Sequence, residues 1–456
     1  MRRAASGGEA QEAGRSRRTA AGNCAGVFNA KGIGAMNEVS AAGRWEIFRF
    51  RPYLLYFIGH TISMLGTGMQ FIATSWLAMQ LTGNPASVAY VLIFTSLPGV
   101  VLSPLIGVFV DRFDRKWIAV LMDVFRAAAL LAIPLLWWQG MLEPWHLYLV
   151  TFLVALGDEI YTPAAMSLIR EVIPPQKLLY ANSTNAIAMQ SGVLLGAGVG
   201  GLLVGLSSAV SVMGINAASF LVSAVCILLI RKGVVRPTRA EQASSGGFRS
   251  YWEDMKEGWT HIRGRHTILI FYAMIFFIRM SLYTINVLLG PFAKDTLMVG
   301  AAGFGYIDAS FALGAVTGNL LLPPIARALG NRLVMTGGMA GIALAIFLFG
   351  FSGGLGIAML LYFLIGAFFQ VGILFITRAQ EETELAYQGR VHSTFNTVFS
   401  ILSLGIYLIM AQLMNELSLR YLFAIQGLIV AVAAFIAFYA LYARPRSKPA
   451  VQNLSN

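Results

Sequence analysis

Charged residues, cysteines and histidines are all scarce in this chain of 456 residues. Only 12% of the residues are Asp, Glu, Lys or Arg, about half of the share that a soluble domain carries. The two cysteines allow at most one disulfide, which excludes a disulfide-rich scaffold. The five histidines are scattered without Cys or carboxylate partners at metal-ligand spacing, and no Walker-type lysine loop is present. The sequence therefore predicts no enzyme, no cofactor and no metal site.

Apolar residues, in contrast, make up 57% of the chain and give it a mean hydropathy of +0.69. They recur in stretches of about 20 residues, each long enough to cross a hydrocarbon core of about 30 Å as a helix. Since helices satisfy their own backbone polar groups in lipid, an all-α membrane protein is predicted. Twelve transmembrane helices are expected, at residues 53–81, 86–110, 116–139, 145–169, 182–206, 208–231, 267–293, 301–324, 332–352, 355–378, 391–414 and 419–443.

The basic residues indicate how these spans are oriented. All but four of the 33 Lys and Arg lie before the first span, between the sixth and seventh, after the last, or at the ends of the even-numbered spans. The four others are Lys294 and Arg420 in the opposite loops and Arg126 and Arg279 inside spans. The positive-inside rule then places both termini in the cytoplasm. The expected location of the protein is the plasma (inner) membrane of a bacterial cell. Topology thus explains the net charge of +12, and no nucleic acid is expected as a partner.

One long hydrophilic connection divides the spans into two halves. The expected parts are a largely disordered cytoplasmic N-terminal segment, a six-helix bundle, a cytoplasmic linker, a second six-helix bundle and a tail, at residues 1–51, 52–231, 232–266, 267–443 and 444–456. In the linker, apolar residues at helical spacing predict an amphipathic helix on the membrane surface, at Tyr251, Met255, Trp259 and Ile262. The exits of the fourth and tenth spans, 169–175 and 377–382, are alike, which favours two pseudo-symmetric bundles; the alternative is a chance likeness between two polar loops.

A glycine and several charged residues mark the turn between the second and third spans: Gly107, Asp111, Arg112, Arg115 and Lys116. They match the pattern G-x-L-a-D-R-x-G-R-[RK], and through it the chain resembles the major facilitator superfamily; Phe109 and Asp114 replace a Leu and a Gly. The form D-R-F-D-R-K is similar to the branch of macrolide, tetracycline and siderophore exporters. The resemblance covers 52–444 and implies the fold of that superfamily. It also implies that Asp111 lies at a helix N-terminus of the other half and holds the cytoplasmic side closed. There a carboxylate gains about 0.3–1 kcal/mol; the alternative is a turn that only fixes topology.

The fifth span carries a glycine stripe. Gly192, Gly196 and Gly200 recur every four residues, next to Gly201, and should let another helix approach closely. The eighth span has Gly314 and Gly318 at the same spacing. The run also resembles the antiporter motif of the superfamily, with Ala197 in place of its Pro, which implies packing against the other half near a central cavity. The alternative is ordinary packing of small residues.

Ionisable residues inside a membrane are costly and functional by default. Asp158 and Glu159 lie near the middle of the fourth span, about 100° apart around the helix. A carboxyl group that is neutral in one conformation and charged in another is what proton coupling needs, while a static ion pair is the alternative. Asp123 and Arg126, three residues apart on one helix face, also enter the predicted coupling set, although this pair can neutralise itself. For Arg279, a counter-ion to the fourth span and an attractor of anionic substrates both remain open.

The resemblance further implies that the first, fourth, seventh and tenth spans line the cavity, with candidate residues Gln70, Asp158, Glu159, Tyr161, Arg279, Tyr283, Asn286, Phe369 and Gln370. The function expected from it is proton-coupled efflux of amphipathic small molecules by alternating access, by a monomer. Alternatives are a dedicated siderophore or metabolite exporter, an uptake symporter of the same fold, and, from another class, a lipid flippase or a non-transporting membrane sensor. The direction of flux in everted vesicles separates import from export.

Overall fold

The computed structural model describes residues 46–174, 177–230, 256–257, 259–260, 262–263, 265–384 and 387–442. Within helices, the side chains of residues 102–112 and of four single positions lie outside this description. Most of the N-terminal segment, most of the linker and the C-terminal tail, with the predicted helix residues Tyr251 and Met255, therefore lie outside the described residues. Of the segment 1–51, which the sequence predicts to be largely disordered, the structure describes only residues 46–51. Glu46–Arg49 form the 3₁₀-helix η1, in which Ile47 is fully buried.

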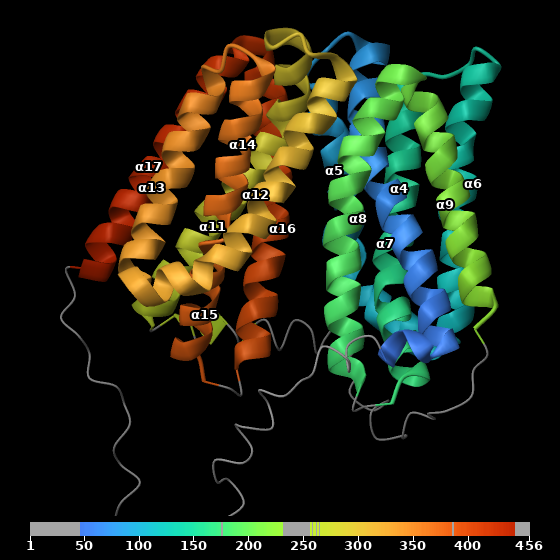
Figure 1. The fold of residues 1–456 in the computed structure, drawn as a ribbon, viewed down its shortest axis with the longest axis horizontal. Helices are drawn as coiled ribbons and strands as arrows, with labels where there is room; N and C mark the ends of the chain where they lie inside the picture. Colours follow the sequence, from blue (N-terminus) through green and yellow to red (C-terminus); the bar gives the residue numbers. More distant parts are fainter. Residues whose placement is uncertain are drawn as a thin grey trace, which may run out of the picture.

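Two groups of helices stand side by side along the longest axis of the molecule (Figure 1). The first group contains α4 (Arg51–Thr82), α5 (Ser87–Arg112), α6 (Arg115–Trp138), α7 (Pro144–Val172), α8 (Leu178–Leu206) and α9 (Ala209–Leu228). The second contains α11 (His266–Pro291) with the π-helix η4 (Phe292–Thr296), α12 (Gly300–Leu329), α13 (Asn331–Gly350), α14 (Leu355–Phe369), α15 (Gly372–Glu382), α16 (Gln388–Glu416) and α17 (Leu419–Tyr442).

Helix occupies most of each of the predicted spans. Ten helices of the described residues are long and apolar enough to cross a membrane. The helix α4 is not among these ten because it carries many polar residues, several of which are buried, such as His60, Ser63 and Ser75. Only Ser87–Val101 of α5 counts as a shorter apolar helix. The all-helical membrane fold predicted from the sequence is confirmed.

The contacts between helices repeat from one group to the other. In the first, α4 packs on α9, α9 on α6, α6 on α7 and α7 on α5. In the second, the equivalent pairs are α11 with α17, α17 with α13, α13 with α14 and α14 with α12. The two main contacts between the groups, α8 with α12 and α16 with α5, are also equivalent. This repetition is what two pseudo-symmetric six-helix bundles require.

The predicted tenth span is not one continuous helix. The helix α14 ends at Phe369 and α15 begins at Gly372, so that Gln370 and Val371 form a break. Another departure follows α11, where the chain winds into η4 and then turns at Met298 and Gly300, both of which have a positive φ. Beyond this turn α12 extends five residues past the predicted end of its span, to Leu329.

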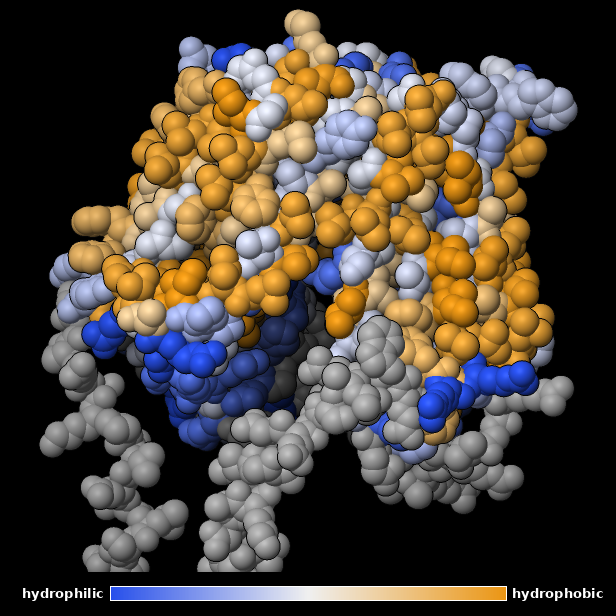
Figure 2. All heavy atoms as spheres, in the orientation of Figure 1, coloured by the Kyte–Doolittle hydropathy of each residue, from blue (hydrophilic) through white to orange (hydrophobic). Residues whose placement is uncertain are grey.

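Hydrophobic residues cover the middle of both halves in Figure 2, and hydrophilic residues gather at their ends. At the lower end in Figure 2 the molecule is hollowed between the two halves. This is the end at which α9 ends and α11 begins (Figure 1). Basic residues lie at this end of the helices, among them Arg115, Lys116, Arg332 and Arg378. It is the end that the sequence predicts to be cytoplasmic. The predicted amphipathic segment meets the second half here, since Ile262 is buried in its core and Glu257 pairs with Arg390 at 2.5 Å.

Candidate functional site

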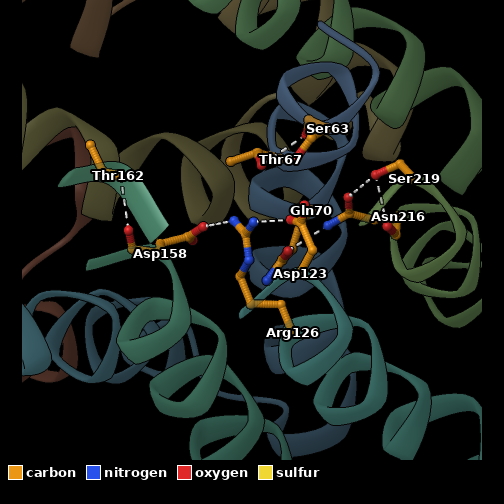
Figure 3. A network of polar contacts seen from close by, with 9 residues as sticks. All are labelled: Ser63, Thr67, Gln70, Asp123, Arg126, Asp158, Thr162, Asn216 and Ser219. Atoms are coloured by element: carbon orange, nitrogen blue, oxygen red, sulfur yellow. Dashed lines mark hydrogen bonds and ion pairs between the residues drawn. The ribbon is translucent and has the colours of Figure 1, made fainter. Parts of the chain in front are cut away.

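A buried arginine joins two carboxylates in the middle of the first half (Figure 3). Arg126 of α6 forms one ion pair with Asp123, one turn earlier on the same helix, and a second with Asp158 of α7. Arg126 and Asp123 are fully buried, whereas the side chain of Asp158 is 39% exposed. The structure therefore brings together three of the four residues predicted for proton coupling. Asp158 is the one member of this network with a partly exposed side chain.

Aromatic rings hold the guanidinium in place. The Arg126 guanidinium carbon lies 4.3 Å from the ring centroids of both Tyr161 and Phe220, at which separation a cation is attracted to the ring faces. Gly157 makes room for the stem of the arginine, because a Cβ at this position would lie 2.5 Å from Arg126 Cγ. Tyr161 was expected to line the cavity, but it is only 3% exposed and lies beside Arg126. Its ring supports the ion-pair network instead.

Glu159 occupies different surroundings from its neighbour Asp158. It is exposed, and its Oε1 lies beside α5, 2.6 Å from where a Cβ on Gly99 would stand. The two adjacent carboxylates therefore face different elements, as their angular separation on a helix predicts. Only Asp158 of the two takes part in the Arg126 network.

A second polar chain connects α4 and α9 (Figure 3). Asn216 donates a hydrogen bond from Nδ2 to Gln70 Oε1 at 2.6 Å, and the Ser219 hydroxyl donates to Asn216 Oδ1 at 2.9 Å. Gln70, a predicted cavity residue, is thus bonded to another helix of its own bundle.

The remaining predicted cavity residues lie in the second half and are all partly buried. The Arg279 guanidinium lies 5.7 Å from the Phe399 ring, and the described part of the chain gives it no ion pair; Asp158 pairs with Arg126 instead. Tyr283 packs edge-on against Tyr407, and Asn286 lies one turn further along α11. Phe369 packs against Phe311, while Gln370 donates from Nε2 to the Gly366 carbonyl at the break after α14.

At the basic end of the first half, the motif turn ties three helices together. Asp114, which replaces a glycine of the superfamily pattern, caps α6 by accepting from the backbone N–H groups of Lys116 and Trp117. Arg115 forms an ion pair of 2.6 Å with Glu171 at the end of α7. Lys116 Nζ donates to two carbonyls at the end of α9, both at 2.7 Å. The other motif residues, Gly107, Asp111 and Arg112, have side chains outside the described part.

The two glycine stripes do not pack on one another. Gly192, Gly196 and Gly200 face residues 64–69 of α4, within the same bundle. Gly314 and Gly318 face Phe363 and Ala367 of α14, also within one bundle. A different glycine of α8, Gly201, meets the other half. A Cβ there would lie 2.7 Å from the Ala301 carbonyl oxygen and from Gly305 Cα of α12. The helix α8 thus presents one bare face to α4 and another to the second half.

Two polar residues in the second half were not among the predicted site residues. Lys294 of η4 donates from Nζ to the Met79 carbonyl at the end of α4, over 3.1 Å, and so joins the two halves at the end opposite the hollow. Asp308 lies within α12 and is partly buried. The sequence could have identified Asp308, because it is the one acidic residue of the predicted span 301–324.

Comparison with protein families matches residues 42–446 to the family described as transmembrane secretion effector. Macrolide efflux protein A of Streptococcus pyogenes is 23% identical over 405 residues, which cover 86% of this chain and 96% of that protein. The multidrug efflux pump Tap of Mycolicibacterium fortuitum is 26% identical over 197 residues, or 41% of this chain and 48% of Tap. An MFS-type transporter of Bacillus subtilis, YfiS, is 28% identical over 213 residues, which span 46% of this chain and half of YfiS.

Solved structures share the fold. The nucleoside transporter NupG superposes with a TM-score of 0.67 at 15% identity, over 86% of this chain and all of NupG. A bacterial homologue of the human lysosomal transporter Spinster gives a TM-score of 0.64 at 14% identity, over 86% of this chain and 97% of the homologue. At these identities the likeness concerns the fold.

Proposed function

This chain belongs to the transmembrane secretion effector family, efflux-type transporters of the major facilitator superfamily, and from that premise we propose that it exports amphipathic small molecules in exchange for protons. It is a multi-pass membrane transporter and not an enzyme. We also propose that protons are the coupling ion, that transport is outward and that the protein acts as a monomer. Both termini would lie in the cytoplasm of a bacterial cell, with the protein in the inner membrane. The observation that carries the coupling is the Arg126 network between α6 and α7.

The charge of this network favours the uptake of one proton. Two carboxylates and one guanidinium carry a net charge of −1, and a proton on either carboxylate makes the network neutral. Unbalanced charge is costly inside a membrane. Asp158 is the exposed carboxylate, and Asp123 keeps its ion pair with Arg126 on the same helix when Asp158 is neutral. Other titratable groups close to the network are Tyr161 and His60 near Arg126 and Tyr56 and Cys226 near Asp123. Glu159 is the neighbour of Asp158 in the sequence.

Protonation of Asp158 would release α7 from α6 at the middle of the first half. The bond from Arg126 to Asp158 is the ion pair that joins these two helices at this depth in the described residues. When it breaks, one restraint between α6 and α7 at this depth is lost, which would let α7 shift relative to α6 and reshape the space between the halves. This is a two-state element that a proton can bias, as coupling requires.

The state seen here supports an alternating-access cycle. The halves meet through α8 with α12 and α5 with α16, and Lys294 bonds them at one end. At the other end the molecule is hollowed between them (Figure 2). With the orientation inferred from the basic residues, this is a conformation open to the cytoplasm. In the opposite conformation Asp111 would hold the cytoplasmic side closed, the role that the superfamily pattern implies.

Transport by purified protein in liposomes tests the coupling. An imposed pH gradient should drive accumulation of a radiolabelled macrolide, the class named for the relative in S. pyogenes. We expect Asp158→Asn to lower gradient-driven accumulation at least tenfold while exchange without a gradient continues. Glu159→Gln is the matched control, because it removes an equal charge at the next residue, and it should retain at least half of the accumulation.

Two outcomes would contradict the proposal. If Asp158→Asn responds to the gradient as the wild type does, Asp158 is not the coupling group. If siderophores or lipids accumulate and macrolides do not, the substrate class is wrong, and flux only toward the cytoplasm would make the protein an uptake symporter.

A further inference from the structure

We propose that Asp308 of α12 binds the positive charge of an organic cation, in a subsite built from the second half. This inference rests on the proposed export function and names a substrate class for it: amphipathic molecules that carry a cationic centre. Asp308 lies outside the Arg126 network, in the other six-helix bundle.

The position of Asp308 on its helix places it at the meeting point of three helices. One turn earlier, Gly305 touches Gly201 of α8 across the two halves, and Ala309 lies 3.4 Å from the Cβ position of Gly198 on the same helix. One turn later, the Phe311 backbone touches Gly366 of α14. At 100° per residue, Asp308 falls between the face that meets α8 and the face that meets α14. It therefore lies at the inner seam between the halves.

The opposite side of α12 is the one that faces outward. Tyr306, Leu313 and Leu320 are 39%, 56% and 72% exposed, and they lie on the far side of the helix from Asp308. Asp308 itself is partly buried, on the side of α12 away from these exposed residues.

The carboxylate has no partner of its own among the described residues. No hydrogen bond, ion pair or charged neighbour reaches Asp308 in this part of the chain. An isolated carboxylate inside a membrane is costly unless it is neutralised by a proton or by a cation. A ligand that brings a positive charge would supply the missing partner.

A cluster of aromatic rings reaches Asp308 through Tyr362. Asp308 is close enough to the Tyr362 hydroxyl for an electrostatic interaction. Phe311, one turn from Asp308, packs at 5.2 Å on Tyr362 and at 5.9 Å on Phe369. A carboxylate beside aromatic faces recognises a cationic centre with an apolar body, because the carboxylate matches the charge and the rings match both the charge and the apolar surface. An inorganic cation would instead require several oxygen ligands.

Equilibrium binding to the full chain in lipid nanodiscs tests this subsite. The probes are tetraphenylphosphonium, a permanently charged lipophilic cation, and triphenylphosphine oxide, a neutral molecule with similar rings. We expect Asp308→Asn to weaken tetraphenylphosphonium binding at least tenfold and to leave triphenylphosphine oxide binding within twofold of the wild type. Asp308→Glu should restore part of the affinity for the cation.

Asp295→Asn is the matched control, since it removes the same charge from an exposed position of η4 in the same half. It should leave the binding of both probes unchanged. Elution as a single symmetric peak and an unchanged melting temperature establish that each variant is folded. Should Asp308→Asn misfold, competition between the two probes for the wild-type protein still tests the subsite. A cation subsite requires tetraphenylphosphonium to bind at least tenfold more tightly than triphenylphosphine oxide.

The subsite and the proposed function fail in different experiments. Equal tetraphenylphosphonium affinity in the wild type and Asp308→Asn overturns the subsite, even when pH-driven flux in liposomes is intact. Absence of pH-driven flux, together with Asp308-dependent binding in nanodiscs, overturns the proton-coupled export and leaves the subsite standing.

Discussion

Single residues decide how the charges inside the first half are arranged. The spacing of Asp123 and Arg126 on one helix was enough to predict that they are neighbours. The ion pair from Arg126 to Asp158 could not be predicted in this way, because it depends on the register of α6 against α7, which no local pattern encodes. Gly157 contributes to that register, since it is the residue of α7 that faces the arginine stem.

Gly157→Ala should therefore destabilise the protein. The new Cβ would stand 2.5 Å from Arg126 Cγ, and this side chain is enclosed by Tyr161 and Phe220 and cannot swing away. Overpacking of this kind costs about 1–3 kcal/mol, measured as a lower melting temperature of the purified protein and accompanied by weaker pH-driven transport.

Gly214→Ala in α9 is the control for this prediction, because no atom lies within 4 Å of the Cβ position there. It should melt at or slightly above the wild-type temperature. Equal melting temperatures for Gly157→Ala and the wild type would show that Gly157 does not set the position of Arg126.

Helices of this protein approach each other through glycines. The sequence predicted a close approach at the α8 stripe, but it could not identify the partner, since a bare face fits any helix with a complementary surface. The structure assigns Gly192, Gly196 and Gly200 to α4 and leaves the contact with the other half to Gly201. The break after α14 was missed for a different reason. Gln370 and Val371, which form it, are neither Pro nor Gly, and the adjacent Gly372 is not a distinctive signal because glycine is frequent in membrane helices.

Gly201→Ala should impair transport without unfolding either bundle. Its Cβ would meet the backbone of α12 at 2.7 Å, at the carbonyl oxygen of Ala301 and at Cα of Gly305, so the two halves could not close on each other here. We expect a several-fold lower transport rate at an unchanged amount of protein in the membrane.

Gly205→Ala is the matched control one turn further along the same face, where the Cβ would lie 3.5 Å from Ala302, an ordinary van der Waals distance. It should transport at nearly the wild-type rate. A wild-type rate for Gly201→Ala would mean that the cycle does not require this close contact of α8 with α12.

For the molecule as a whole, the sequence predicted most of the architecture. Long apolar runs, short loops and one hydrophilic connection were sufficient for the helical spans and the two bundles, because in lipid the backbone must satisfy its own hydrogen bonds. The conformation and the contacts between the halves could not be predicted from the sequence, since both depend on the relative placement of segments that are far apart in the chain. Lys294 illustrates this limit. It is one of two basic residues in the loops predicted to face away from the cytoplasm, and the sequence indicated only its use in topology. In the structure it forms a hydrogen bond that joins η4 to α4.

Lys294→Met should loosen the end of the molecule at which this bond lies. The variant loses the hydrogen bond to the Met79 carbonyl, and the two halves should separate there more often. In a Cys24→Ser, Cys226→Ser background, Met79→Cys reports on this opening, since residue 79 is 1% exposed. We expect a membrane-impermeant maleimide added outside intact cells to label this cysteine several-fold faster in the Lys294→Met variant.

Arg420→Met serves as the control, because Arg420 is the other basic residue predicted on that side and it is exposed on α17. It should not change the labelling rate. Identical rates in all three proteins would show that Lys294 does not restrain the halves, and labelling only from the cytoplasmic side would reverse the proposed orientation.

The single net charge of the Asp123–Arg126–Asp158 network has a consequence for bioenergetics. A cycle that carries one proton inward and one monovalent cation outward moves no net charge, so the membrane voltage, worth about 2.3 kcal/mol per charge at 100 mV, would neither help nor oppose it. The same cycle with a neutral cargo would be electrogenic. Cells that maintain a steep voltage and a shallow pH difference would then expel uncharged compounds more effectively than cationic ones.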